Sequence, residues 1–173
     1  MAASAYMLSL LVRQYLFLVD AFQNRYPSSW LVWEPGAWRP ARTTLEGNSA
    51  STRLAEDTGP ARPAGSDALC FELKNGTAQL TLGRSSESDI FINDLTLSRE
   101  HLVLTWAGTQ WQATVAPTSS VATQVEGKPI AQGVTVPLKS GMHITAGDVH
   151  LTFYDVVGFL ARLREEAARP ARA

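Results

Sequence analysis

The chain has 173 residues, 45% of them hydrophobic, and its 15 basic and 16 acidic residues give a formal net charge of −1. A chain of this length and apolar content can bury the core of one domain with additional elements. The near-neutral charge argues against a general nucleic-acid binder, because such proteins usually carry a basic face. The single cysteine, Cys70, cannot form an intramolecular disulfide, and its apolar surroundings favour an inert core thiol over a reactive one.

The N-terminal segment, residues 1–40, begins with an apolar pattern. Residues 5–26 repeat apolar side chains at helical spacing until Pro27 ends the pattern. Arg13 and Asp20 interrupt it, so we expect an amphipathic helix in a cytoplasmic protein, without membrane insertion or an export signal. Three tryptophans follow within nine residues. Helix and tryptophans either pack on the main domain or form a docking or self-association surface.

Residues 41–67 are mostly small, polar and turn-forming, with only two leucines. Such a segment buries too little apolar area to offset the entropy of ordering, which predicts a flexible linker between two ordered parts. Its threonines would be accessible to a Ser/Thr kinase, and an unmodified spacer is the simpler interpretation. These threonines are Thr43, Thr44, Thr52 and Thr58.

From residue 68 to about residue 155 the apolar period changes to two, and short runs alternate with glycine-containing turns. Asn75-Gly76 lies between two such runs and predicts a tight hairpin. Many short strands with frequent turns indicate an antiparallel sandwich or barrel. Residues 156–173 return to helical spacing and predict a short helix followed by a tail.

The stretch GRSSESDIFINDLTLSREH, residues 83–101, carries an ordered set of polar groups between two strand-like runs. It resembles the core signature of the forkhead-associated (FHA) domain: Gly-Arg, then an Asp-Ile-x-Ile/Leu strand, then Ser-Arg-x-His. The later EGKPI turn fits the second half of the family, so the resemblance covers about residues 68–154. It implies a mainly β fold, a two-sheet antiparallel FHA-like β-sandwich with an N-terminal helical segment and a short C-terminal helix.

The family's apical loops bind phosphothreonine in a partner protein, and the residues here suit that ligand. Phosphothreonine adds about −1.5 to −2 charges and three acceptor oxygens, so its receptor needs a cation and aimed donors. Arg84 can present a planar donor fork, and Ser98 can donate its hydroxyl. The resemblance implies phosphate contact for these two and peptide contact for Arg99 and Ser120. Arg99 could equally be an outward-facing strand residue.

Two further residues of the signature are expected to support the binding loops. Gly83 is a backbone requirement before the arginine, and His101 is a structural histidine that braces the loops. No catalytic or metal site is expected, because the three histidines lack the paired spacing of metal ligands. The sequence also lacks a nucleophile elbow and a phosphate-cradling glycine loop. We therefore expect a non-enzymatic protein that needs no cofactor.

One position departs from the family. Where the family has an asparagine that bonds the main chain of the bound peptide, this chain has Val121. Valine cannot make that bond, so Thr118, Ser119 or Ser120 would have to replace it. We expect a phosphothreonine-peptide-binding adaptor in Ser/Thr kinase signalling, whose partner is a threonine-phosphorylated protein such as a kinase or its substrate. The alternative is an FHA-fold assembly module with weak or no phosphate dependence.

Overall fold

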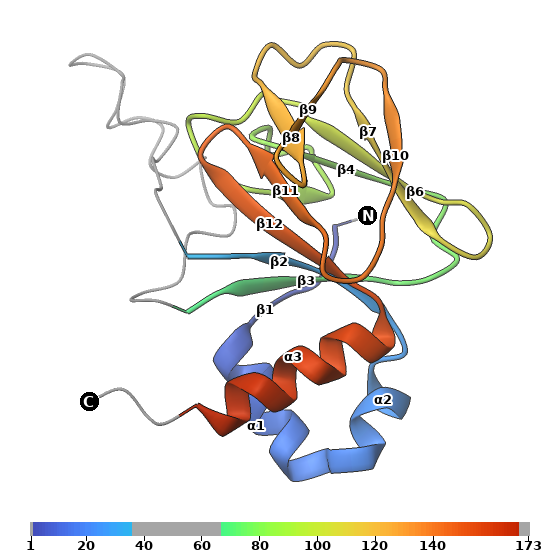
Figure 1. The fold of residues 1–173 in the computed structure, drawn as a ribbon, viewed down its shortest axis with the longest axis vertical. Helices are drawn as coiled ribbons and strands as arrows, with labels where there is room; N and C mark the ends of the chain where they lie inside the picture. The colour runs from blue at the N-terminus through green and yellow to red at the C-terminus, as the bar shows by residue number, and fades with distance from the viewer. Residues whose placement is uncertain (1, 36–66, 170–173) are drawn as a thin grey trace.

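The computed structural model describes residues 2–35 and 67–169. Two β-sheets face each other, and the helices gather at one end of the resulting sandwich (Figure 1). One sheet has the order β1-β3-β2-β12-β11-β8-β9 and the other the order β10-β7-β6-β4-β5. The first contains β1 (Ala5–Met7), β2 (Ser29–Trp33), β3 (Leu69–Leu73), β8 (Thr123–Val125), β9 (Lys128–Ile130), β11 (His143–Ala146) and β12 (Val149–Tyr154). The second contains β4 (Gln79–Gly83), β5 (Ile90–Phe91), β6 (Leu102–Trp106), β7 (Trp111–Val115) and β10 (Thr135–Pro137).

The predicted fold class, a mainly β two-sheet sandwich with N-terminal and C-terminal helices, is confirmed. The helices are α1 (Leu8–Leu18), α2 (Phe22–Arg25) and α3 (Val156–Ala168), and a 3-10 turn, η1 (Val19–Ala21), joins the first two. Among the described strands, all pairs are antiparallel except β4 with β5, which run parallel. Because parallel neighbours cannot be joined by a tight hairpin, residues 84–89 form a longer connection that brings the chain back beside β4.

The tryptophan-rich segment contributes an interior strand to the first sheet, which the sequence pattern did not predict. Strand β2 pairs with β3 on one side and β12 on the other, and all five of its residues are buried. Leu31 and Trp33 face the core between the sheets, while Trp30 and Val32 face the helices. A strand covered on both faces reads as a continuous apolar run, so its sequence lacks the alternation that marks a half-exposed strand.

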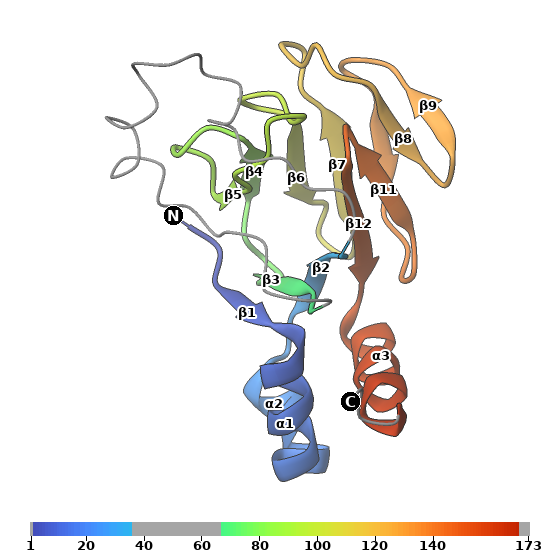
Figure 2. The same ribbon diagram turned by 90° about the vertical axis from the view of Figure 1, so that its left-hand side faces the viewer.

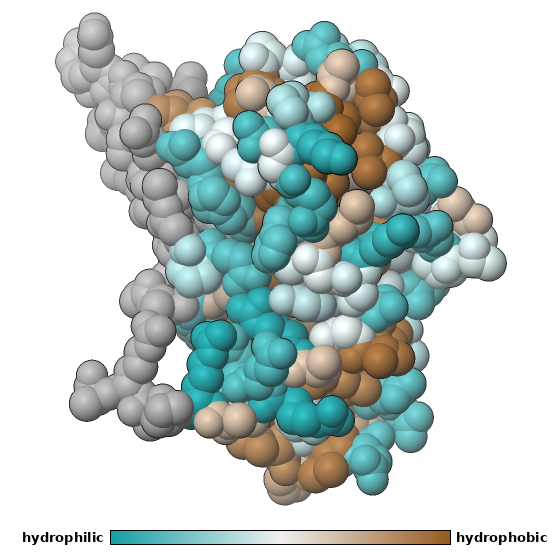
Figure 3. All heavy atoms as spheres, in the orientation of Figure 1, coloured by the Kyte–Doolittle hydropathy of each residue, from teal (hydrophilic) through white to brown (hydrophobic). Residues whose placement is uncertain are grey.

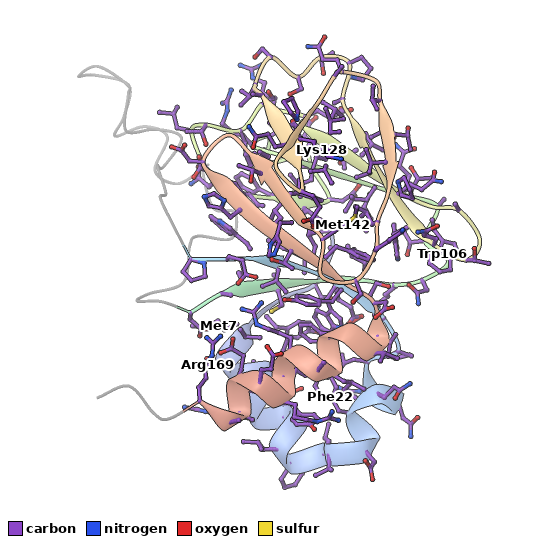
Figure 4. All side chains as sticks on the ribbon, in the orientation of Figure 1. Met7, Phe22, Trp106, Lys128, Met142 and Arg169 are labelled. Carbon is purple, nitrogen blue, oxygen red and sulfur yellow. The ribbon has the colours of Figure 1, made fainter. Side chains whose placement is uncertain are left out.

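The helices form a third layer over the outer face of β2 and β3. The ring of Phe159 on α3 stacks on Trp30 with centroids 4.6 Å apart, and Leu11 and Leu163 are fully buried beside them. Phe22 lies among the helices beneath α3 (Figure 4). Cys70 on β3 belongs to the same cluster, and burial raises the pKa of its thiol well above the usual value. The predicted inert core thiol therefore matches the position of Cys70.

The continuous helix expected over residues 5–26 is interrupted at two places. Ala5–Met7 pair with β3 as an edge strand, so the helix begins only at Leu8. It ends at Val19, which has a positive φ of 49°. The chain then turns back, and Phe22 and Tyr26 reach the helical core. Periodicity detected the apolar face, but the tertiary packing of Phe22 and Tyr26 fixed where the helix breaks.

The hairpin predicted at Asn75-Gly76 is wrong. The turn exists, because the amide of Thr77 donates to the carbonyl of Lys74 and Gly76 has φ +92°. However, β3 belongs to one sheet and β4 to the other. Both edges of β3 are already paired, with β1 and β2, so β4 has no edge to join. The turn therefore carries the chain from one sheet to the other.

The ends of the predicted linker lie on neighbouring strands. Trp33 of β2 pairs with Leu69 of β3, so residues 36–66 connect two adjacent strands. These residues, which include the four threonines, lie outside the described residues. The two ordered parts predicted on either side, residues 1–40 and 68–155, contribute strands to one sheet. The segment therefore joins two paired strands of one sheet.

The C-terminal helix is fastened to the sheet by an ion pair. The guanidinium of Arg162 donates to both carboxylate oxygens of Glu34, at 2.8 Å each, and to the Tyr154 hydroxyl at 2.8 Å. At the start of the helix, the Asp155 carboxylate accepts the Gly158 amide at 2.7 Å as an N-cap.

Among the described residues, none of the helices is both long and apolar enough to cross a membrane.

Candidate functional site

Three loops meet at the end of the sandwich that lies away from the helices (Figure 2). They follow β4 (residues 84–89), β5 (residues 92–101) and β7 (residues 116–122). The residues predicted to bind a phosphopeptide all lie in or beside these loops. Backbone and side-chain hydrogen bonds join the three loops to one another.

Gly83 is required by a close backbone approach. A Cβ placed on this residue would lie 2.0 Å from the carbonyl oxygen of Arg99, which leaves no room for any side chain. Its φ is not positive, so the backbone requirement for glycine comes from contact with the neighbouring loop and not from a left-handed turn. The absence of a side chain lets the loops after β4 and β5 run against each other.

Arg84 is held in place by the loop that follows β5. Its backbone amide donates to the carbonyl of Ser98 at 2.9 Å, and its side-chain Nε donates to the carbonyl of Leu97 at 2.9 Å. The side chain is half-buried, and no carboxylate in residues 2–35 or 67–169 forms an ion pair with it. The Nε bond fixes the plane of the guanidinium, so its two terminal amino groups remain for an acceptor from outside the loop.

Ser98 lies beside this arginine, at the junction of the second and third loops. Its hydroxyl is 3.1 Å from the hydroxyl of Ser119 and accepts the backbone amide of Ser120 at 3.2 Å. The Ser98 residue is only 8% exposed. The structure therefore brings Arg84, Ser98 and the backbone of Ser120 together, while the hydroxyl of Ser98 already has protein partners.

His101 connects the same loop to the first sheet. Its Nδ1 accepts the backbone amide of Ser98 at 3.2 Å, and its Nε2 lies 2.7 Å from the hydroxyl of Thr123 on β8. Because Nδ1 accepts, Nε2 carries the proton and donates to Thr123. The residue is fully buried, and burial lowers its pKa from 6.5 to about 4. A neutral histidine can make both bonds at neutral pH, and it positions Ser98.

Arg99 and Ser120 are exposed. The carbonyl of Arg99 accepts the amide of Ser85 at 3.0 Å, so its backbone belongs to the contact between the first two loops. Its side chain is free to extend into solvent. Exposure at the edge of the loops suits contact with a peptide chain better than contact with a deeply held phosphate.

Sequence reasoning missed Gln132 and Thr123, which hold the binding loops, and named Ser119 only as a candidate replacement for the missing asparagine. Gln132, in the connection between β9 and β10, donates a hydrogen bond from Nε2 to the carbonyl of Ser119. Ser119 is 1% exposed and bonds Ser98, and Thr123 is the partner of His101. The carbonyl of Val121, at the departure from the family pattern, accepts the hydroxyl of Ser119 at 3.4 Å. Spacing reveals few of these partners, because most of the pairs come from segments that are distant in the sequence.

The loop after β5 is also fastened to the opposite sheet. The hydroxyl of Thr96 donates to the carboxylate of Asp94 at 2.6 Å and accepts the amide of Asp148 at 2.8 Å. Gly147, with φ +58°, lets the turn between β11 and β12 approach Thr96, because a Cβ there would lie 2.5 Å from the Thr96 carbonyl. The loop that carries Ser98 and His101 is therefore fixed near its middle by Thr96 and at its C-terminal end by His101.

Residues 80–147 match the family model of the FHA domain. No curated protein matches the chain. Among solved structures, it is similar to the FHA domain of an Arabidopsis thaliana hypothetical protein, with 16% identity, a TM-score of 0.50, and coverage of 84% of this chain and 92% of that one. The FHA domain of the Chlamydia trachomatis protein CT664 gives 18% identity, a TM-score of 0.49 and coverage of 74% and 98%. The N-terminal FHA domain of Saccharomyces cerevisiae Rad53p, solved with a phosphothreonine peptide, gives 21% identity, a TM-score of 0.42 and coverage of 49% and 73%.

The matched residues contain all three loops, from β4 to the turn after β11. The chain contains an FHA domain, which confirms the resemblance found in residues 83–101. The strands β2 and β12 and the helices lie outside the matched residues and flank them on both sides in the sequence.

Proposed function

We propose that this FHA domain binds threonine-phosphorylated segments of partner proteins through the end of the sandwich where the three loops meet. The observation that carries the proposal is the fixed orientation of Arg84, whose Nε bond to Leu97 leaves two amino groups for an anion. A phosphate placed there would receive a charge-assisted, bidentate contact. The family match supports the same class of ligand, because it includes all three loops.

The proposal assigns each residue of the site a role. Arg84 contacts the phosphate, and Ser98 contacts it after its hydroxyl turns away from Ser119. Arg99 and Ser120 contact the peptide on either side of the phosphothreonine. Gly83 and His101 do not touch the ligand, and they keep the first two loops in place. The protein acts by recognition alone, as an adaptor in Ser/Thr kinase signalling in the cytoplasm, and it requires no cofactor.

Fluorescence polarisation with a labelled phosphothreonine peptide pool and the identical unphosphorylated pool tests the proposal. We expect binding only to the phosphorylated pool. Arg84→Ala should weaken it about ten- to hundredfold, because a hydrogen bond to a charged group contributes about 1.5–3 kcal/mol. Arg164→Ala is the matched control, since Arg164 is exposed on α3 and should leave the affinity unchanged. Equal binding of both pools, or no effect of Arg84→Ala, would contradict the proposal.

A second candidate function is an assembly module that has lost most of its dependence on phosphate. Two observations favour it: Val121 offers no side-chain amide to a bound peptide, and the hydroxyl of Ser98 is occupied by Ser119 and Ser120. In that case, partners would bind the loops or the helices without regard to phosphorylation. The two peptide pools separate these functions, because only the first requires a difference between them.

A further inference from the structure

Helix α1 presents an apolar face that no described part of the chain covers. Leu8 and Leu11 on its inner face are buried, while Phe17 on the outer face is 88% exposed, Leu16 is 59% exposed and Leu10 is 44% exposed. Hydrophobic residues gather over the helical end of the molecule at the bottom of Figure 3. Isolated exposed apolar residues are ordinary, but an almost fully exposed phenylalanine within an apolar group indicates a binding surface.

A pocket lies directly beside this phenylalanine, between α1 and α2. Its volume is about 350 Å³, and it is lined by Arg13, Gln14, Phe17, Leu18, Arg25 and Tyr26. The guanidinium of Arg25 lies 5.7 Å from the centre of the Tyr26 ring, and the hydroxyl of Tyr26 donates to Gln14 at 2.6 Å. The pocket thus offers apolar walls together with two arginines. An aromatic ring with an acidic neighbour is the ligand that such a pocket suits.

The same surface also presents an aromatic ring with an acidic neighbour. Asp20 follows Phe17 by three residues, lies in η1 and is exposed. Within the described residues, Asp20 makes no ion pair. One patch of the molecule therefore holds a protruding aromatic ring with an acid beside it, and next to these a pocket with two cations. A patch that contains both a projection and its complement can form an isologous interface, in which each copy contributes both halves.

We propose that the chain forms a two-fold symmetric dimer through α1 and α2, in which Phe17 of each copy enters the pocket of the other. Asp20 of each copy then faces Arg25 of the other, so the two charge contacts form at the edges of the paired rings. Opposite charges placed in this way fix the register of the two copies. The interaction does not depend on phosphate binding, because its residues lie in the helical layer and not in the three loops.

The dimer would present two phosphopeptide-binding ends. The loops lie at the end of each sandwich away from the helices (Figure 2), so pairing through the helices leaves them open. A partner with two phosphothreonines, or two partners held together, would then bind with greater apparent affinity than a single site allows. This consequence rests on the proposed function, whereas the dimer itself does not.

Sedimentation equilibrium of the complete chain across a wide concentration range tests the dimer. We expect the wild type to dimerise reversibly. Phe17→Ala should weaken dimerisation about a hundredfold or more, because each dimer loses two buried rings and a loss of tenfold per ring is typical of interface anchors. Val157→Ala is the matched control, since Val157 is an apolar residue on α3 with 72% exposure, and it should have no effect. A monomeric wild type at the highest soluble concentration, or a Phe17→Ala dimer as stable as the wild type, would overturn the proposal.

A charge exchange makes the test independent of any folding defect. Asp20→Arg alone and Arg25→Asp alone should both be monomeric, because each homodimer would bring like charges together. A mixture of the two variants should form a heterodimer, because one chain then carries arginine at both positions and the other carries aspartate at both, so each of the two contacts pairs opposite charges. Failure of the mixture to associate, with both variants folded by circular dichroism, would overturn the pairing. A third outcome would also overturn the dimer: the wild type remains monomeric in solution but sediments with anionic vesicles, and Phe17→Ala abolishes that sedimentation. The exposed face of α1 would then bind a lipid surface.

Discussion

Single residues determine whether the three loops can meet. Gly83 is the clearest example, because the carbonyl of Arg99 occupies the space where its Cβ would lie. The signature therefore contains a glycine for steric reasons and an arginine for chemical ones, at adjacent positions. The sequence identified both residues, but only the structure distinguished close approach from a turn as the reason for Gly83.

Gly83→Ala should destabilise the domain by about 1–3 kcal/mol, the range expected for overpacking, and should also weaken phosphopeptide binding. The added methyl group must push the backbone of Arg99 away and thereby move Ser98. Urea unfolding followed by tryptophan fluorescence measures the change in the free energy of unfolding. Ser86→Ala, at an exposed position in the same loop, is the control and should change it by less than about 0.5 kcal/mol.

His101 should make stability depend on pH. Its pKa is about 4 in the folded protein and 6.5 ordinarily. Between pH 6.5 and pH 4, this histidine is therefore protonated in the unfolded chain but neutral in the folded protein. Its contribution to stability is therefore fully present above pH 6.5 and is lost as the pH decreases towards 4. Between about pH 7 and about pH 5.5, where aspartate and glutamate stay ionised, we expect a loss of about 1 kcal/mol.

Urea unfolding at these two pH values checks the dependence. His101→Asn should remove it, because asparagine does not titrate, whereas His150→Asn, at an exposed position on β12, should retain it. Equal pH dependence in the wild type and in His101→Asn would contradict the assignment of His101 as a buried neutral histidine.

At the scale of whole elements, α3 and the first sheet are held together by ring stacking and by an ion pair. Helix α3 contacts the sheet through the stacked pair Phe159 and Trp30, and Arg162 joins it to Glu34 at the end of β2. Helical periodicity predicted α3 as an element but not its partner. The partner strand, β2, reads as an apolar run because it is covered on both faces, and a short apolar run without alternation does not distinguish strand from helix.

Phe159→Ala should reduce the free energy of unfolding by about 3–5 kcal/mol, as expected for removal of a fully buried ring. Val157→Ala on the same helix should have little effect, because Val157 is exposed to solvent. A thiol reagent provides a second measurement, since Cys70 is buried beneath the helices and should react faster in Phe159→Ala than in the wild type. Unchanged stability and unchanged thiol reactivity would show that α3 is not part of the cooperative unit.

For the molecule as a whole, the topology decides what the connection between β2 and β3 can do. Because Trp33 pairs with Leu69, replacing residues 36–66 with a short glycine-serine loop should preserve the fold. Loop-closure entropy changes slowly with length, so the free energy of unfolding should change by no more than about 2 kcal/mol. Circular dichroism and urea unfolding of the shortened chain measure this. Loss of the fold would show that the connection contributes more than a link between paired strands.

The sequence predicted the structure correctly where a pattern has only one structural interpretation. Alternation, turn residues and the spacing from Gly83 to His101 predicted the sandwich and the loop signature. Composition set apart residues 41–67, but it could not show that the chain returns to a neighbouring strand. Likewise, the partners that hold the site come together only through folding, as with Thr123 beneath His101 and Gln132 against Ser119. Pairings between distant strands follow from topology, which local sequence does not specify.

A phosphothreonine-binding site formed by the three loops has a direct spectroscopic test. The experiment is two-dimensional ¹⁵N NMR of the complete chain during titration with a phosphothreonine peptide. We predict that the largest shift changes occur at the backbone amides of Arg84, Ser98, Arg99 and Ser120, and that they are absent with the unphosphorylated peptide. Shift changes that are independent of phosphate, or that fall on α1 and α2 and not on the loops, would contradict this assignment of the site.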